Sequence, residues 1–110
     1  MSAQGFSWLL IAASVGAEVA GTIALRFADG LTRPLPSIAV FLSYGVAIWL
    51  MSLAVRQLEV GLTYAVWAGS GTALIALIGI LCFNESAHTM RLLGFVFIVL
   101  GVVTLNVSAR

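Results

Sequence analysis

One acidic residue in the middle of a long apolar segment constrains this chain more than any other feature. Glu18 is the only charged residue between positions 7 and 25, and a helix of that length crosses the hydrocarbon core of a bilayer. About 18 Å of helix rise separates Glu18 from Phe6, which places the carboxyl group near the middle of the span. An ionisable group is costly at that depth and indicates a functional site. We therefore expect Glu18 to bind a ligand, with pairing inside the protein as the alternative.

The rest of the chain predicts an all-α integral membrane protein. Of its 110 residues, 62% are hydrophobic and 8% are charged, whereas a soluble domain has about 25% charged residues. Four long apolar segments predict transmembrane helices at about 6–27, 35–55, 60–83 and 92–107, which form a single domain over residues 1–110. The first segment has no basic flank and is too long for a signal peptide, so we expect it to remain as a span.

Several other functional classes find no support in the sequence. A net charge of +1 with no lysine gives no reason to expect nucleic-acid binding. The single Cys82 excludes a disulfide within the chain, and the single His88 has no companions at ligand spacing. No nucleophile–base pair, metal cluster or phosphate-binding loop is visible. We expect neither an enzyme nor a cofactor nor a metal site.

The first segment has one polar stripe. On a period of 3.6 residues, small and hydroxylated residues share a face with Glu18. We expect these neighbours to line a cavity around the carboxyl group: Ile11, Ser14, Gly21 and Thr22.

Aromatic residues in the second and third segments are candidates for the same site. Tyr44 lies near the centre of its segment, where its hydroxyl needs a partner because it is surrounded by hydrocarbon. Tyr64 and Trp67 are three residues apart and share a helix face. Aromatic rings beside a carboxylate can hold a lipophilic cation through ring-face attraction. We expect Glu18, Tyr44, Tyr64 and Trp67 to bind proton or substrate, with ordinary helix packing as the alternative for the aromatic residues.

Two pairs of glycines have different expected roles. Gly69 and Gly71 flank a serine in the third segment, which predicts a bend and a hinge there. Gly94 and Gly101 are seven residues apart and share a face of the fourth segment, which suits close helix packing between two chains.

The arginines predict no clear orientation in the membrane. Four spans place both termini on one side, with Arg56 and Arg110, while Arg33 and Arg91 lie on the other side and Arg26 close to it. Because the arginines are nearly balanced between the two sides, the positive-inside rule predicts no orientation. Four helices cannot easily enclose a cavity that opens alternately to each side, a problem that larger transporters solve with inverted repeats. We therefore expect an antiparallel, dual-topology homodimer.

The motifs together resemble the small multidrug resistance transporters. The matching residues are 17–22 and 25–27 in the first segment, 30–33 in the loop, 64–71 in the third segment, and Gly94, Gly101 and Val102 in the fourth. In order, they cover essentially the whole chain.

The resemblance implies a proton-coupled antiporter in the bacterial inner membrane, which exports lipophilic, aromatic and quaternary ammonium cations as multidrug efflux. The implied partners are these cations, protons, membrane lipid and a second chain in an antiparallel dimer, with a heterodimer with a homologue left open. Glu18 would bind proton and drug alternately, and Tyr44, Tyr64 and Trp67 would contribute to drug binding.

Gly21 favours one branch of that family. A separate branch exports guanidinium-type compounds and typically has a tryptophan where this chain has Gly21, so the multidrug, quaternary-ammonium branch is expected. Ser14 and Ala68 stand where the family often has alanine and serine, and both bear on hydrogen bonds around Glu18. Arg26 replaces a common lysine, and Glu59 replaces a common proline.

Two other functions remain open at this point. One is a guanidinium-type cation/proton exporter built on the same scaffold. The other is a non-transporting membrane interaction protein, in which Glu18 serves only in helix pairing.

Overall fold

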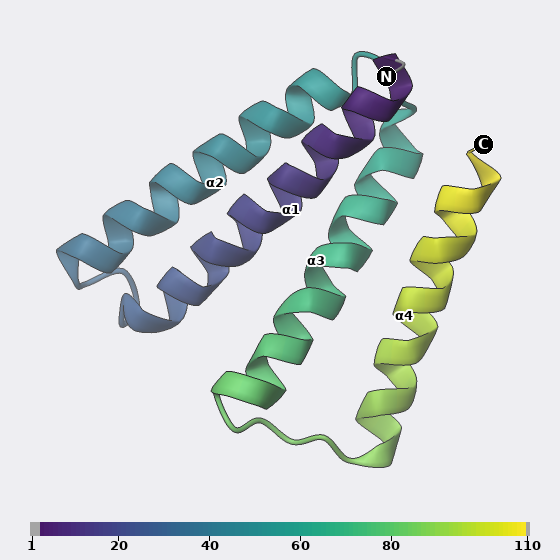
Figure 1. Ribbon diagram of the computed structural model, residues 1–110. Coiled ribbons are helices and arrows are strands. Elements are labelled where there is room, and N and C mark those ends of the chain that lie inside the picture. The colour runs from purple at the N-terminus through teal and green to yellow at the C-terminus, as the bar shows by residue number, and fades with distance from the viewer. Residues whose placement is uncertain (1–2, 110) are drawn as a thin grey trace.

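A computed structural model of the protein describes residues 3–109, which form four α-helices (Figure 1). The helices are α1 (Ala3–Phe27), α2 (Pro34–Ala54), α3 (Val60–Cys82) and α4 (Thr89–Ser108). All four are long and apolar enough to cross a membrane. This confirms the expected all-α fold with four transmembrane helices. Residues 1, 2 and 110 of the expected domain, with Arg110 of the arginine comparison, lie outside the described residues.

Left-handed backbone and proline separate α1 from α2. Asp29, Gly30 and Leu31 have φ values of 51°, 68° and 66°, and consecutive residues in this region cannot continue a right-handed helix. α2 then begins at Pro34, where the missing N–H is no loss because the first helical residues have no acceptor for it. α4 begins after His88, whose Nδ1 accepts a hydrogen bond of 3.4 Å from the backbone N–H of Arg91.

α1 lies at the centre of the molecule. It packs along α2 and also contacts α3, whereas α4 packs against α3 (Figure 1). The buried core consists of Ile11, Val15 and Val19 of α1 with Ala54 and Leu58 at the end of α2 and the loop after it. The molecule measures 41 × 36 × 21 Å, and its smallest dimension corresponds to about two helix diameters. The four helices thus form a flat slab about two helices thick.

Much of the apolar surface of the slab is uncovered. No described residue of α4 is buried, and large apolar side chains are exposed along α2 and α4, among them Phe41, Trp49, Phe97 and Leu100. An apolar surface of this extent is normal only where lipid or another protein covers it.

Candidate functional site

The polar stripe of α1 faces its neighbours α2 and α3. Ser14, Glu18 and Thr22 lie on successive turns; Ser14 is fully buried, while Glu18 and Thr22 are half-buried. Ile11 and Gly21 of the same stripe are buried as well. The expected cavity-lining residues of α1 therefore all lie on one inward face.

A hydrogen-bond chain connects α2 to the Glu18 carboxylate. The Tyr44 and Thr22 hydroxyl oxygens are 2.7 Å apart, and the Thr22 hydroxyl also lies 3.1 Å from Oε1 of Glu18 and 3.0 Å from its backbone oxygen. An ionised carboxylate only accepts hydrogen bonds, so Thr22 donates to Glu18 and Tyr44 donates to Thr22. The structure thereby brings Tyr44 to the acidic residue through Thr22.

Gly21 makes room for the Tyr44 ring. A Cβ atom on Gly21 would lie 2.7 Å from two carbons of that ring and 3.1 Å from the Cβ of Ser43. Any larger residue at this position would displace Tyr44, so the glycine is a condition for the hydrogen-bond chain.

A second set of hydrogen bonds lies one turn before Glu18. The Ser14 hydroxyl donates to the backbone oxygen of Ala47 at 2.6 Å and accepts a hydrogen bond of 2.9 Å from Nε1 of Trp67. One buried side chain of α1 therefore links the backbone of α2 to an aromatic residue of α3.

The carboxylate faces a small cavity between α1 and α3. This cavity has a volume of about 160 Å³ and is lined by Glu18, Trp67, Ala68, Gly71, Thr72 and Ile75. A Cβ atom on Gly71 would lie 3.0 Å from Oε2 of Glu18, so the glycine lets the carboxylate rest against α3. Glu18 and Trp67, both predicted from the sequence, lie on the wall of one cavity.

Glu18 has no cationic partner within residues 3–109. Its carboxylate has one hydrogen-bond donor there, the Thr22 hydroxyl. Three arginines make contacts near the helix ends. The guanidinium group of Arg26 lies 5.2 Å from the centre of the Phe83 ring. Arg33 donates a hydrogen bond to the backbone oxygen of Phe27, and Arg91 donates one to the backbone oxygen of Ser86. No described side chain thus supplies a positive charge to the Glu18 carboxyl group.

Tyr64 is not brought to the carboxylate within one chain. It is 57% exposed, and its ring centroid lies 5.7 Å from that of Trp67 at an interplanar angle of 39°. It therefore extends the aromatic surface of Trp67 outward from the slab.

The four glycines with expected roles have distinct surroundings. α3 continues as a helix through Gly69 and Gly71, and a Cβ atom on Gly69 would collide with the side chain of Val102 on α4. Gly94 and Gly101 are exposed, with open space around them. The hinge and dimerisation roles stay predictions.

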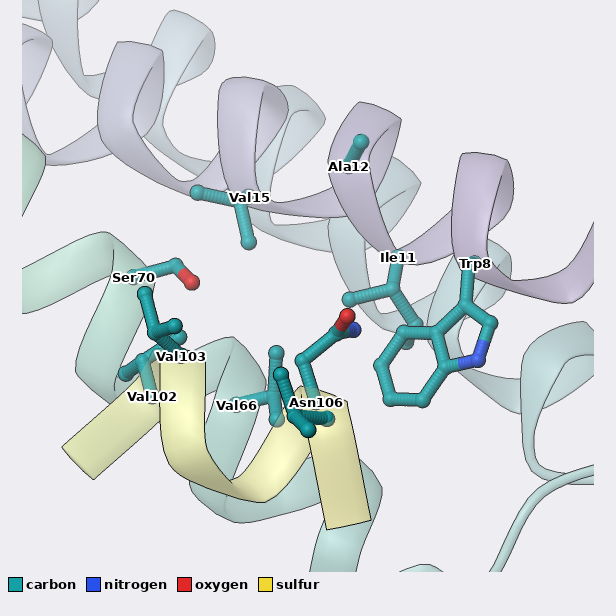
Figure 2. A pocket seen from close by; sticks show the side chains of 10 residues that line it. Trp8, Ile11, Ala12, Val15, Val66, Ser70, Val102, Val103 and Asn106 are labelled. Atoms are coloured by element: carbon teal, nitrogen blue, oxygen red, sulfur yellow. The ribbon is translucent and has the colours of Figure 1, made fainter. Parts of the chain in front are cut away.

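A larger cavity of about 560 Å³ lies between α1, α3 and α4 (Figure 2). Its walls are apolar except for Ser70 and Asn106, whose polar ends point into it beside Val15, Ile11 and Trp8. No ionisable side chain lines it, so it offers no counter-charge to a cation. Among the described residues there is also no cluster of His, Cys, Asp and Glu that could hold a metal ion.

Two features of the site were not predicted from the sequence. The acceptor on α2 is the backbone oxygen of Ala47, which no side-chain pattern can reveal. Thr72 and Ile75 line the Glu18 cavity with Ala68; their spacing of three and four residues could have indicated this shared helix face.

Comparison with known proteins identifies relatives over nearly the whole chain. Residues 6–98 match the family model described as Small Multidrug Resistance protein. The multidrug resistance protein EbrA of Bacillus licheniformis is 39% identical over 104 residues, which are 94% of this chain and 97% of that protein. The quaternary ammonium compound-resistance protein QacF of Klebsiella aerogenes is 38% identical over 94% of each chain. The nicotine metabolites export pump subunit NepA of Paenarthrobacter nicotinovorans is 39% identical over 93% of this chain and 88% of that protein.

Proposed function

Because the chain belongs to the small multidrug resistance family, we propose that it is a proton-coupled antiporter that exports lipophilic and quaternary ammonium cations. Family membership and four membrane-length helices make it a multi-pass protein of the bacterial cell membrane. They also place it among transport and resistance proteins rather than enzymes.

The proposal rests on one observation, the surroundings of the Glu18 carboxylate. Its carboxylate lies within a transmembrane helix, accepts a hydrogen bond from Thr22 and has no basic partner among residues 3–109. A charge in the membrane requires a counter-charge or a proton. A lipophilic cation and a proton are the two mobile species that can satisfy it, and they compete because one carboxylate carries one charge.

The aromatic surface supports lipophilic cations as substrates. Trp67 lines the cavity that Glu18 faces, and Tyr64 extends the surface next to it. Ring faces attract cations, and the attraction grows where water is excluded. The names of EbrA and QacF, which refer to multidrug and quaternary ammonium resistance, agree with this substrate class.

An antiparallel dimer is part of the proposal. A cavity of about 160 Å³ beside Glu18 is smaller than the roughly 300 Å³ or more of a typical ligand site, so a second chain would complete it. α4 has no buried residue, and Gly94 and Gly101 stand free on its surface, as a helix interface between chains would require. The name of NepA calls that relative a subunit, which supports assembly and leaves a heterodimer open.

In the proposed cycle, the ionised Glu18 of either chain attracts the cation on one side of the membrane. Protonation after the cavity opens to the other side removes the negative charge and releases the cation. Since either ligand displaces the other, a proton gradient drives export.

The deciding experiment compares the protein with Glu18→Gln in liposomes under an imposed pH gradient. Addition of tetraphenylphosphonium should release protons from the wild-type protein and none from the variant, which can neither ionise nor bind the cation. Glu59→Gln is the matched control, because Glu59 is exposed and its side chain makes no cap hydrogen bond; it should behave as the wild type.

Three outcomes would contradict the proposal. Proton release with guanidinium alone would indicate the guanidinium-type exporter. Release with neither cation would favour a non-transporting interaction protein. Binding of tetraphenylphosphonium to Glu18→Gln that still depends on pH would remove Glu18 from the exchange.

A further inference from the structure

Ser14 lies where α1, α2 and α3 meet, and its hydroxyl group both donates and accepts a hydrogen bond there. It is 0% exposed. Its single proton goes to the backbone oxygen of Ala47 at 2.6 Å, and its oxygen accepts the indole N–H of Trp67 at 2.9 Å. Because Ala47 is part of α2, the acceptor is fixed by the helix backbone and cannot rotate away. The direction in which Ser14 presents its free lone pair to Trp67 is therefore set by α2.

This arrangement determines what Trp67 can offer a ligand. The indole N–H is the only hydrogen-bond donor of tryptophan, and Ser14 occupies it. The part of Trp67 that lines the Glu18 cavity can then contribute only ring surface. Tyr64 packs on the same indole, with centroids 5.7 Å apart, and restrains the ring from the outer side.

The other hydroxyl groups near the carboxylate are also engaged. The Thr22 hydroxyl is hydrogen-bonded to Glu18 and to the Tyr44 hydroxyl. The cavity therefore presents a carboxylate and an aromatic surface, with the Thr72 hydroxyl as the remaining polar side chain on its wall. Such a site favours a cation with aromatic groups, whose charge needs no hydrogen bonds.

We propose that Ser14 is a positioning residue, which holds the indole of Trp67 in a fixed orientation and thereby gives the site its preference for aryl-substituted over alkyl-substituted cations. This inference rests on the proposed function, since it concerns the same cavity. It adds a determinant of substrate range that acts through Trp67 and does not itself touch the cation.

The test compares Ser14→Ala with the wild type, using two cations that share their charge and lack N–H groups: tetraphenylphosphonium and tetrabutylammonium. Without the hydroxyl, the indole is free to turn. We expect the affinity for tetraphenylphosphonium, whose phenyl groups can stack on the indole, to fall about three- to tenfold, the range of an aromatic pair. The affinity for tetrabutylammonium, which has no ring to stack, should change less than about twofold. The matched control is Ser52→Ala, because Ser52 is exposed on α2 and bonds only to the Trp49 backbone oxygen.

A spectroscopic measurement separates positioning from general stability. In the NMR spectrum of the full-length protein, the indole N–H signal of Trp67 should shift in Ser14→Ala, while that of Trp49 stays in place. Trp67→Phe keeps a ring without the N–H group, so Ser14→Ala should add no further loss of selectivity in that background.

An unmoved Trp67 signal, or an equal loss of affinity for both cations, would overturn the inference. If Ser14→Ala does not fold, Trp67→Phe still tests the proposal, because it removes the N–H group that Ser14 holds. Full retention of the preference for aryl-substituted cations in Trp67→Phe would contradict the proposal. Failure of the proposed function looks different: neither cation would then release protons from the wild-type protein, whereas the N–H shift would still report on Ser14.

Discussion

Gly21→Ala should separate Tyr44 from Thr22, and the size of the effect follows from the space around Gly21. The new Cβ atom would lie 2.7 Å from two ring carbons of Tyr44. Carbon atoms settle at about 3.5–4.0 Å, so the ring must retreat by roughly 0.8 Å or more. The hydroxyl oxygens of Tyr44 and Thr22 are 2.7 Å apart, and such a retreat carries them beyond the usual range of about 2.5–3.0 Å.

The expected loss of stability is about 1–3 kcal/mol. Overpacking costs about 1–3 kcal/mol and the lost hydrogen bond about 1 kcal/mol, while alanine gains about 1 kcal/mol over glycine within a helix. The free energy of unfolding in detergent micelles measures this change, and tetraphenylphosphonium-driven proton release in liposomes measures its effect on transport, which we expect to fall.

Gly16→Ala is the matched control, because it lies on the same helix with no atom within 4 Å of the new Cβ. It should gain the helix preference of alanine and lose nothing. If Gly21→Ala is as stable as Gly16→Ala and releases protons like the wild type, the contact between Gly21 and Tyr44 does not limit the site, and the reasoning is wrong.

Two further predictions concern the cavity wall and the free face of α4. Trp67→Leu removes the aromatic wall beside Glu18 and should weaken the binding of tetraphenylphosphonium, whose phenyl groups can stack on the indole, about three- to tenfold more than the binding of tetrabutylammonium. An equal loss of affinity for both cations in a binding titration would exclude this stacking. Gly101→Ala fits the open space within one chain and should not reduce the stability of that chain, yet it should weaken self-association measured by energy transfer in diluted proteoliposomes. Gly69→Ala, which collides with Val102, should instead reduce the stability of the chain by about 1–3 kcal/mol, and the reverse pattern would place the interface elsewhere.

The helices and the position of Glu18 were predictable because each depends on local sequence. Long apolar segments predict spanning helices, and a period of 3.6 residues places Ser14, Glu18 and Thr22 on one face. The structure agrees on both points. The position of Tyr44 near the centre of an apolar segment predicted that its hydroxyl needs a partner, and Thr22 is that partner.

Contacts that depend on how helices rotate against one another were not predictable in this way. Trp67 and Ser14 are 53 residues apart, and no local pattern relates them. Gly71 shows a different limit of sequence-based prediction. A flexible backbone and the close approach of another group both favour glycine, so the residue type alone does not distinguish the two roles. The sequence predicted a hinge there, which stays a prediction, and the structure adds that Gly71 lies within a continuous helix against the Glu18 carboxylate.

The Thr22 hydroxyl can adjust to the proposed exchange of proton and cation at Glu18 by rotation alone. Its single proton has two acceptors at nearly equal distances, the Glu18 side chain at 3.1 Å and the Glu18 backbone oxygen at 3.0 Å. When a proton or a cation occupies the carboxylate, the O–H bond can swing to the backbone and return afterwards, while every heavy atom keeps its place. A rotation of this kind takes picoseconds to nanoseconds. In the proposed cycle, this hydroxyl would therefore readjust far faster than the helices can move, and the large motions of the bundle would set the rate of turnover.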